Sequence, residues 1–371
     1  MLNALWLVPL VLWLGRGDSD TDSSPLDILY LGLTAFFWIG HRVSSTWLAY
    51  CTEAYRPLLR SDRVRFVVLP LLVTIACFVV FLPADAALPW TREERVVGLA
   101  IFDYALVTYH FAAQHFGALS LYRARAARAG CARTRCLDRI FALGVGGTLI
   151  FLADVLVGSV AYQDRWIDGW LIPAWVASKQ GEIREAALLV LFVATALMLV
   201  AEARAQRGSL PRVLYILGLA AMVAIALQPR SLFLYLVIWN SQHWILATGL
   251  AAQTPSAEPA PASGTVRRVL HALNSRPWAI LLVLVASSVL LLPFFEVEAN
   301  WQGGTYYGER IFGAVAEGLR TSSWVPALVA LGFATGFVHY LLDRSVYRMS
   351  DPRVRSAACG LLEQPSKLSA R

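Results

Sequence analysis

The sequence predicts an all-α polytopic membrane protein, a transmembrane helical bundle of about ten spans with both termini in the cytoplasm. Three observations predict this class. The chain of 371 residues is 57% hydrophobic and only 15% charged, whereas a soluble domain carries roughly a quarter charged residues. Apolar runs of about 20 residues recur, which is the length that a helix needs to cross hydrocarbon. The loops between these runs alternate between arginine-rich and acidic or mixed.

The apolar runs define the expected spans in order. The first run has no basic segment before it and no small-residue cleavage site, so we expect a short span rather than a cleaved signal peptide. A membrane β-barrel is excluded because its segments are shorter and alternate with a period of two. The expected spans are 3–15, 27–50, 64–83, 97–121, 140–161, 184–203, 212–228, 231–250, 278–297 and 323–343.

Arginine sets the expected orientation. The net charge is +7, and Lys179 and Lys367 are the only lysines in the chain. Because cytoplasmic loops collect basic residues, the arginine-rich segments are expected on the cytoplasmic side of the cell membrane. The sequence has no phosphate-binding loop and no basic face lined with aromatics, so the expected partner is the lipid bilayer and not a nucleic acid. The arginine-rich segments are 56–65, 123–139, 204–212, 267–276 and the tail from residue 344.

The chain is expected to divide into four parts. Residues 1–252 hold the first eight membrane helices and most of the histidines, and residues 253–276 form a cytoplasmic linker that is rich in Pro, Ala and Ser. Residues 277–347 hold the last two membrane helices, and 348–371 form a cytoplasmic tail. The five cysteines are odd in number and lack paired metal-binding spacing, so they predict neither a disulfide framework nor a zinc ribbon.

Four apolar runs each carry a histidine at a similar depth. His41, His110 and His243 lie about 18–21 Å from the outer edge of the core at 1.5 Å per residue, and His339 lies about 24 Å along its helix. His115 follows His110 by five residues. An ionisable side chain in hydrocarbon is costly, so it usually faces the bundle interior and has a function. The sequence therefore predicts that these histidines converge on a metal site, although each alone also fits an interhelical hydrogen bond.

Three further polar residues are candidates for catalysis. Gln114 follows His110 by four residues, and Asp343 follows His339 by four, so each pair shares a helix face. Asp343 is expected to be a ligand or to hold the second ring nitrogen of His339, and Gln114 to donate or accept a hydrogen bond. Asp103, seven residues before His110, is expected to relay protons or to contact substrate.

The predicted histidine and carboxylate ligands indicate which metals and which type of reaction suit the site. Neutral imidazole together with carboxylate suits iron, zinc, manganese or copper. A nitrogen-rich site with open positions in an apolar chamber favours a redox metal. We expect non-haem iron, with copper or a two-metal site as alternatives. Such a site is typical of a metal-dependent oxidoreductase of the oxygenase or hydroxylase type. Its substrate would be lipophilic and reach it through the bilayer, and an electron donor would be a further partner.

The placement of His41, His110, His243 and His339 on separate membrane helices resembles that in the integral-membrane carotenoid-cleaving oxygenases of the Brp/Blh type. The resemblance implies a multi-helix bundle of similar length that holds iron through histidines. The Pro-His-Gly motif of that family is absent, because Gly40 precedes His41 and an arginine follows it. The dense histidine boxes of membrane fatty-acid desaturases are absent as well.

Two other functions fit the same residues. The first is a proton-coupled transporter in which Asp103, Asp154 and His110 form the relay, since intramembrane acids and histidines commonly carry protons. The second is a b-type haem membrane protein with imidazoles as axial ligands. Metal content and the absorption spectrum distinguish these functions from the oxygenase.

Overall fold

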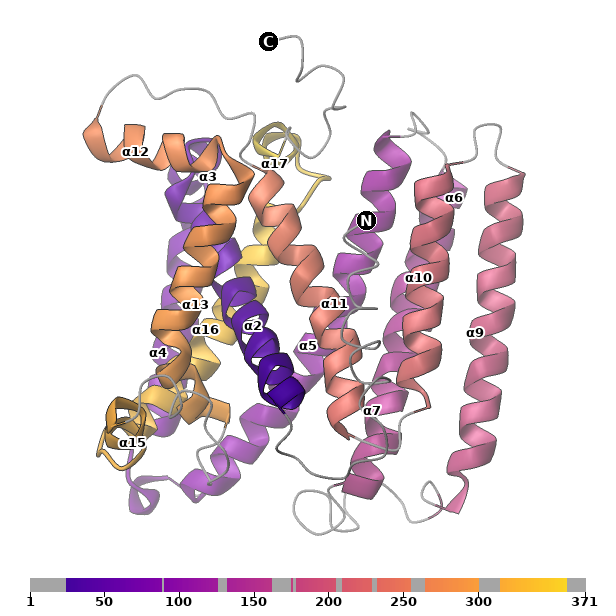
Figure 1. Cartoon of the computed structure of the whole chain (residues 1–371). Coiled ribbons are helices and arrows are strands. Elements are labelled where there is room, and N and C mark those ends of the chain that lie inside the picture. Colours follow the sequence, from indigo (N-terminus) through magenta and orange to yellow (C-terminus); the bar gives the residue numbers. More distant parts are fainter. Residues whose placement is uncertain are drawn as a thin grey trace. The chain divides into compact units, whose positions relative to one another are not determined.

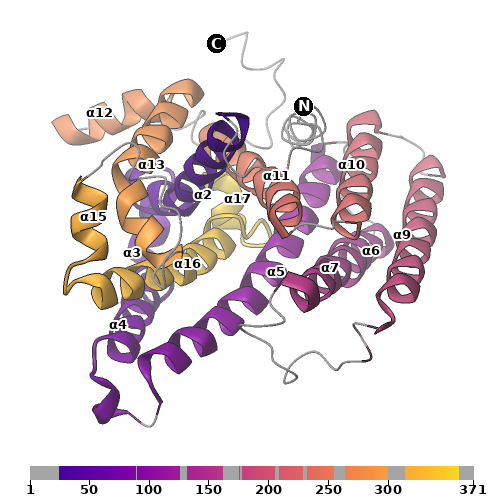
Figure 2. The same cartoon turned by 60° about the horizontal axis from the view of Figure 1, so that its bottom comes forward.

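The computed structural model describes residues 25–88, 90–125, 132–161, 175, 178–204, 209–228, 232–254, 264–299 and 314–358. Every regular element in these ranges is a helix (Figures 1 and 2). The elements are α2 (Pro25–Cys51), α3 (Arg56–Ser61), η2 (Val64–Val68), α4 (Leu69–Phe81), η3 (Asp85–Ala87), α5 (Arg92–Arg125), α6 (Ala132–Arg139), η4 (Ile140–Gly147), α7 (Thr148–Ala161), α9 (Gln180–Ala203), α10 (Leu210–Ala226), α11 (Leu232–Gln253), α12 (Thr265–Asn274), α13 (Pro277–Ala299), α15 (Ala314–Arg320), α16 (Val325–Val346) and α17 (Pro352–Ala357).

Six helical segments in the described residues are long and apolar enough to cross a membrane, judged by length and composition. This confirms the all-α prediction and indicates a multi-pass membrane protein. Helices α2, α10 and α11 overlap three more of the expected spans, whereas the expected span 3–15 lies outside the described residues. A total of about ten spans and the cytoplasmic termini stay predictions. The six segments are Val64–Phe81, Glu94–Arg123, Arg135–Ala153, Gln180–Ala203, Pro277–Phe294 and Val325–Val346.

These helices turn large apolar side chains outward. Phe192 on α9 is 72% exposed, and Leu71 on α4 is 56% exposed. A soluble protein rarely exposes long apolar helix faces to water. Outward apolar faces are stable against lipid chains, so the helices are suited to contact the bilayer.

The chain forms two compact units. Of the described residues, those within 105–243 belong to the first unit, and those within 25–104 and 244–358 belong to the second. Helices α5 and α11 each contribute one part to the first unit and one part to the second. Of the linker expected at residues 253–276, residues 255–263 lie outside the described residues, and Thr265–Asn274 form helix α12.

In the second unit, α16 packs against α4, α2 and α13, and α13 packs against α2 (Figures 1 and 2). Small residues permit the close approach of these helices, as is common in membrane bundles. Gly40 on α2 faces α13 so closely that an added Cβ would stand 3.1 Å from Ser288 Oγ. On α16, Ala330 and Ala334 are buried. The α2 segment that precedes His41 therefore packs directly against α13.

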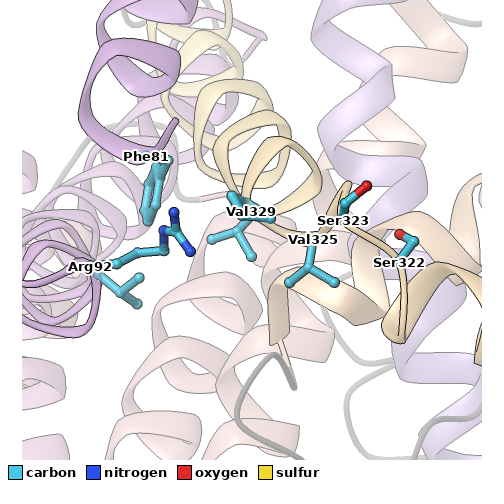
Figure 3. Close-up of a pocket in the computed structure, with 8 residues that line it drawn as sticks. Phe81, Arg92, Ser322, Ser323, Val325 and Val329 are labelled. Atoms are coloured by element: carbon cyan, nitrogen blue, oxygen red, sulfur yellow. The ribbon is translucent and has the colours of Figure 1, made fainter. Parts of the chain in front are cut away.

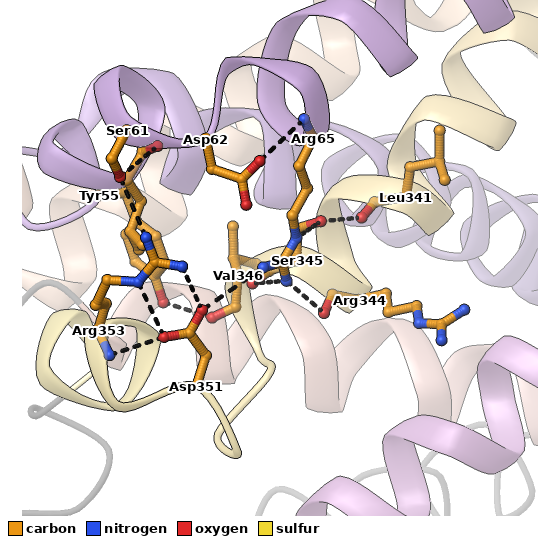
Figure 4. A network of polar contacts seen from close by, with 11 residues as sticks. Tyr55, Ser61, Asp62, Arg65, Leu341, Arg344, Ser345, Val346, Asp351 and Arg353 are labelled. Atoms are coloured by element: carbon orange, nitrogen blue, oxygen red, sulfur yellow. Dashed lines mark hydrogen bonds and ion pairs between the residues drawn. The ribbon is translucent and has the colours of Figure 1, made fainter.

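The end of α16 is held by side chains from the segment that joins α2 to α4 (Figure 4). Tyr55 donates its hydroxyl to the carbonyl of Val346 at 2.6 Å, and Arg65 donates to Ser345 Oγ at 2.8 Å and to the Ser345 carbonyl at 2.9 Å. The last carbonyls of a helix have no partner within the helix, so these bonds satisfy groups that would otherwise be costly to bury. Asp351 and Arg353 extend the network beyond the helix end.

An ion pair attaches the amphipathic helix α12 to the end of α2. Arg267 donates from Nε to Glu53 Oε1 at 2.7 Å and from Nη2 to Glu53 Oε2. Next to it, the Trp47 indole donates to Asn274 Oδ1 at 2.9 Å. The hydrogen bond from Arg267 lowers the pKa of Glu53 below its ordinary value.

This pair predicts a pH dependence for the attachment of α12. A depressed carboxyl pKa contributes stability above the unfolded pKa of about 4.3, and that stability is lost as the pH falls through the lower folded pKa. We expect hydrogen exchange of the 265–274 amides, corrected for its intrinsic pH dependence, to accelerate only in that acidic window. A Glu53→Gln variant, which lacks the titrating group, should show no such step. A step of equal size in that variant would contradict the prediction.

In the first unit, three buried charges and one partly buried charge join α5, α6, α9 and α10. Arg212 donates from Nε to Glu202 Oε2 at 3.0 Å, from Nη2 to Asp138 Oδ1, and from Nη1 to the Leu119 carbonyl at 2.9 Å. Arg123 Nη1 donates to Asp138 Oδ2 at 2.8 Å. The Asp138 side chain is 0% exposed. Two arginines that belong to the segments expected as basic loops are therefore internal members of an ion-pair network.

Candidate metal centre

The second unit contains a buried pair of histidines. His41 on α2 and His339 on α16 are 2% and 1% exposed. Their Nε2 atoms lie 2.9 Å apart, and their ring centroids lie 4.1 Å apart at an interplanar angle of 74°. Two nitrogens bound to one metal at about 2.1 Å lie about 3 Å apart when their bonds are perpendicular. The two rings are thus spaced either for a hydrogen bond or for two neighbouring ligand positions.

A serine orients the His339 ring. Ser45, one turn after His41 on α2, places Oγ 2.8 Å from His339 Nδ1 and is 0% exposed. When the Nδ1–H of His339 donates to Ser45, its Nε2 atom carries the lone pair that a metal requires. Sequence reasoning did not identify Ser45, although the spacing of four residues from His41 places it on the same face.

Replacing Ser45 with alanine is expected to weaken metal binding about 10- to 100-fold, because partners of a ligand histidine have effects of this size. A chelator titration of the metal-loaded protein measures the change. Ser44→Ala is the matched control, since Ser44 is equally buried but bonds the backbone carbonyl of His41 at 2.6 Å. Equal weakening in both variants would show that Ser45 acts only through packing.

The two acidic residues that were predicted as candidates lie on α16 and on α5. Asp343, one turn after His339, is 3% exposed, while the Nδ1 contact of His339 is made by Ser45. Asp103 Oδ1 lies 3.8 Å from the point where a Cβ on Gly336 would stand, and the Arg42 guanidinium lies 3.6 Å from it. Asp103 and Arg42 therefore both lie against Gly336 of α16.

The first unit contains a second histidine pair. His110 on α5 and His243 on α11 are 6% and 1% exposed, with ring centroids 5.1 Å apart at 88°. Gln114 Nε2 lies 3.3 Å from His110 Nε2, as the spacing of four residues requires. The ring of Phe111 lies 5.6 Å from that of His243 and supplies an apolar wall.

His115 makes a different contact. Its Nδ1 lies 2.6 Å from the hydroxyl of Tyr215 on α10, and both residues are 1% exposed. Phe111 packs against its ring at 4.4 Å between centroids. Tyr215 was not identified from the sequence, because a tyrosine in an apolar helix is usually a packing residue. Asp154, the remaining acid of the transporter alternative, has a side chain outside the described residues.

The two histidine pairs belong to different units: His41 and His339 lie in the second, and His110 and His243 lie in the first. Within each unit, buried histidines from two helices lie against each other. The convergence of all these histidines on one metal stays a prediction.

The fold and the histidines define the class of protein as a multi-pass helical membrane protein with buried histidine pairs on its helices. Comparison of the chain with protein-family models, curated proteins and solved structures finds no match.

Proposed function

We propose that this chain is an integral-membrane, metal-dependent oxidoreductase of the oxygenase or hydroxylase type that acts on a lipophilic substrate. The observation that carries the proposal is the 2.9 Å separation of the Nε2 atoms of His41 and His339, two buried imidazoles on different helices. The second buried pair, His110 and His243, whose ring centroids lie 5.1 Å apart, supports it. These four histidines are the ones on which the resemblance to carotenoid-cleaving oxygenases rests.

Iron is the proposed metal because the donors are neutral nitrogens. A site built only from imidazoles leaves the ion with its positive charge and with open positions, which suits a redox metal that binds dioxygen. When bound, the metal would supply the activation of dioxygen. Copper fits the same donors and is the alternative metal.

The residues of the chain would perform the remaining tasks. Ser45 holds the ring of His339, and Gln114 contacts the His110 ring and is placed to form a hydrogen bond with a polar group of the substrate. Phe111, 1% exposed, excludes water beside His243. A dry site limits side reactions of oxidising species. The outward apolar faces of the helices suit a substrate that arrives from the bilayer.

Metal analysis of the purified full-length chain tests this function. We expect close to one iron per chain, no Soret band, and binding of nitric oxide, a probe for an open position, to the ferrous protein. A Soret band would instead identify a b-type haem protein. Metal-free protein that remains folded and does not take up iron would favour the proton-coupled transporter and overturn the enzyme.

A further inference from the structure

A cavity of about 530 Å³ lies at the end of the second unit where α4 ends and where α5 and α16 begin (Figure 3). Its volume is in the range of sites that bind small molecules. Val325 is the first residue of α16, and His339 lies fourteen residues later, which is about 21 Å along the helix. The cavity is therefore separate from the His41–His339 pair. The residues that line it are Phe81, Arg92, Val96, Ser322, Ser323, Val325, Pro326 and Val329.

One charged side chain enters this cavity. Figure 3 shows the Arg92 guanidinium between Phe81 and Val329. Its Nε atom is buried and has no hydrogen-bond partner among the described residues. A buried polar group without a partner is costly, and the cost is larger when the group is charged. The cavity thus contains a cation that lacks a counterion within the part of the chain that the structure describes.

The neighbouring charges are already engaged. Arg95 donates to the carbonyls of Trp90 and Pro83 at 2.5 and 3.0 Å and lies 3.4 Å from Asp85 Oδ1. Asp85 accepts the backbone N–H of Arg92 at 2.6 Å, and its side chain is 56% exposed. Asp85 therefore holds the start of α5 through the backbone and leaves the Arg92 guanidinium facing the cavity.

The walls of the cavity determine what kind of group must be attached to an anion that binds there. Phe81 and Val329 are 0% and 2% exposed, and with Val96 they give the interior an apolar surface. Ser323 lines the opening beside the first turn of α16, where helix amides favour negative charge. A free inorganic anion would leave these apolar walls uncovered, whereas an acyl chain would cover them.

We propose that this cavity binds an acyl-chain amphiphile through a carboxylate or phosphate head group paired with Arg92. Guanidinium pairs well with both head groups through charge-assisted hydrogen bonds. The hydrocarbon chain would lie against Phe81, Val96 and Val329. The site does not depend on the metal centre.

Equilibrium binding of radiolabelled oleate to the full-length chain in neutral detergent tests the proposal. Oleate and oleoyl phosphate should bind, and the tighter of the two identifies the head group. Oleyl alcohol, which lacks charge, and inorganic phosphate, which lacks a chain, should each bind at least about tenfold more weakly. Arg92→Gln should weaken oleate binding about 10- to 100-fold and leave the iron content unchanged.

Two further variants control the experiment. Arg63→Gln removes an exposed arginine elsewhere and should leave oleate binding unchanged. Val325→Trp fills the cavity without changing the charge and should abolish binding. Unchanged affinity in Arg92→Gln, equal loss in Arg63→Gln, or phosphate binding as tight as that of oleoyl phosphate would each overturn the proposal. If Arg92→Gln does not fold, Val325→Trp tests the proposal in its place, and unchanged oleate binding in that variant would overturn it.

Discussion

Replacing His41 with alanine is expected to remove most of the bound metal, lowering its affinity by more than about 100-fold. Partners that only support a ligand already contribute 10- to 100-fold. His41 is one of the two imidazoles whose Nε2 atoms lie 2.9 Å apart, so its loss removes one of two neighbouring ligand positions. Metal content after dialysis against a chelator measures the loss.

His271→Ala is the matched control for this experiment. His271 lies on α12 and is partly exposed, outside both histidine pairs, and its removal should leave the metal content unchanged. Circular dichroism and gel filtration establish that both variants keep the helical fold. Folded His41→Ala protein with full metal content would refute the centre as described.

Replacing Arg212 with methionine is expected to reduce the free energy of unfolding by about 3–5 kcal/mol, the range found when one partner of a buried ion pair is removed. The Asp138 and Glu202 carboxylates are 0% and 6% exposed at their side chains, so both would lose their main partner inside the protein. Thermal unfolding in detergent should show a clearly lower transition temperature.

Two variants separate charge from packing in this network. Arg204→Met changes an exposed arginine at the end of α9 and should alter stability little. Glu202→Gln combined with Arg212→Met removes a carboxylate charge that loses its ion pair with Arg212, while Arg123 still pairs with Asp138, and should recover part of the lost stability. A double variant less stable than Arg212→Met alone would contradict this account.

The two histidine pairs were predictable in part because the cost of burying imidazole applies to every fold. His41, His110 and His243 each interrupt an apolar run, and the requirement for a partner predicts that such side chains face neighbouring helices. Their depth along each helix follows from a rise of 1.5 Å per residue. The rotation of each helix does not follow from depth, so the contact of His115 with Tyr215 could not be predicted.

Ser45 and Arg212 show where a single sequence carries no signal. Buried serines and threonines in helices often bond the carbonyl one turn earlier, as Thr52 and Ser288 do here. A serine that instead bonds a distant imidazole has the same local sequence. Arg212 likewise matches the orientation signal of a basic loop, and only tertiary packing shows that its charge is internal.

The hydrogen bonds from Tyr55 and Arg65 to the last turn of α16 restrain the motion of that end of the helix. A long helix clamped at one terminus moves most at the opposite one. Fluctuations that admit a bulky guest should therefore be larger around residues 325–332 than at His339, which lies within two turns of the clamp. Substrate entry and metal retention would then depend on different parts of one helix. Residues 325–332 could move to admit the substrate while the geometry of His339 is preserved.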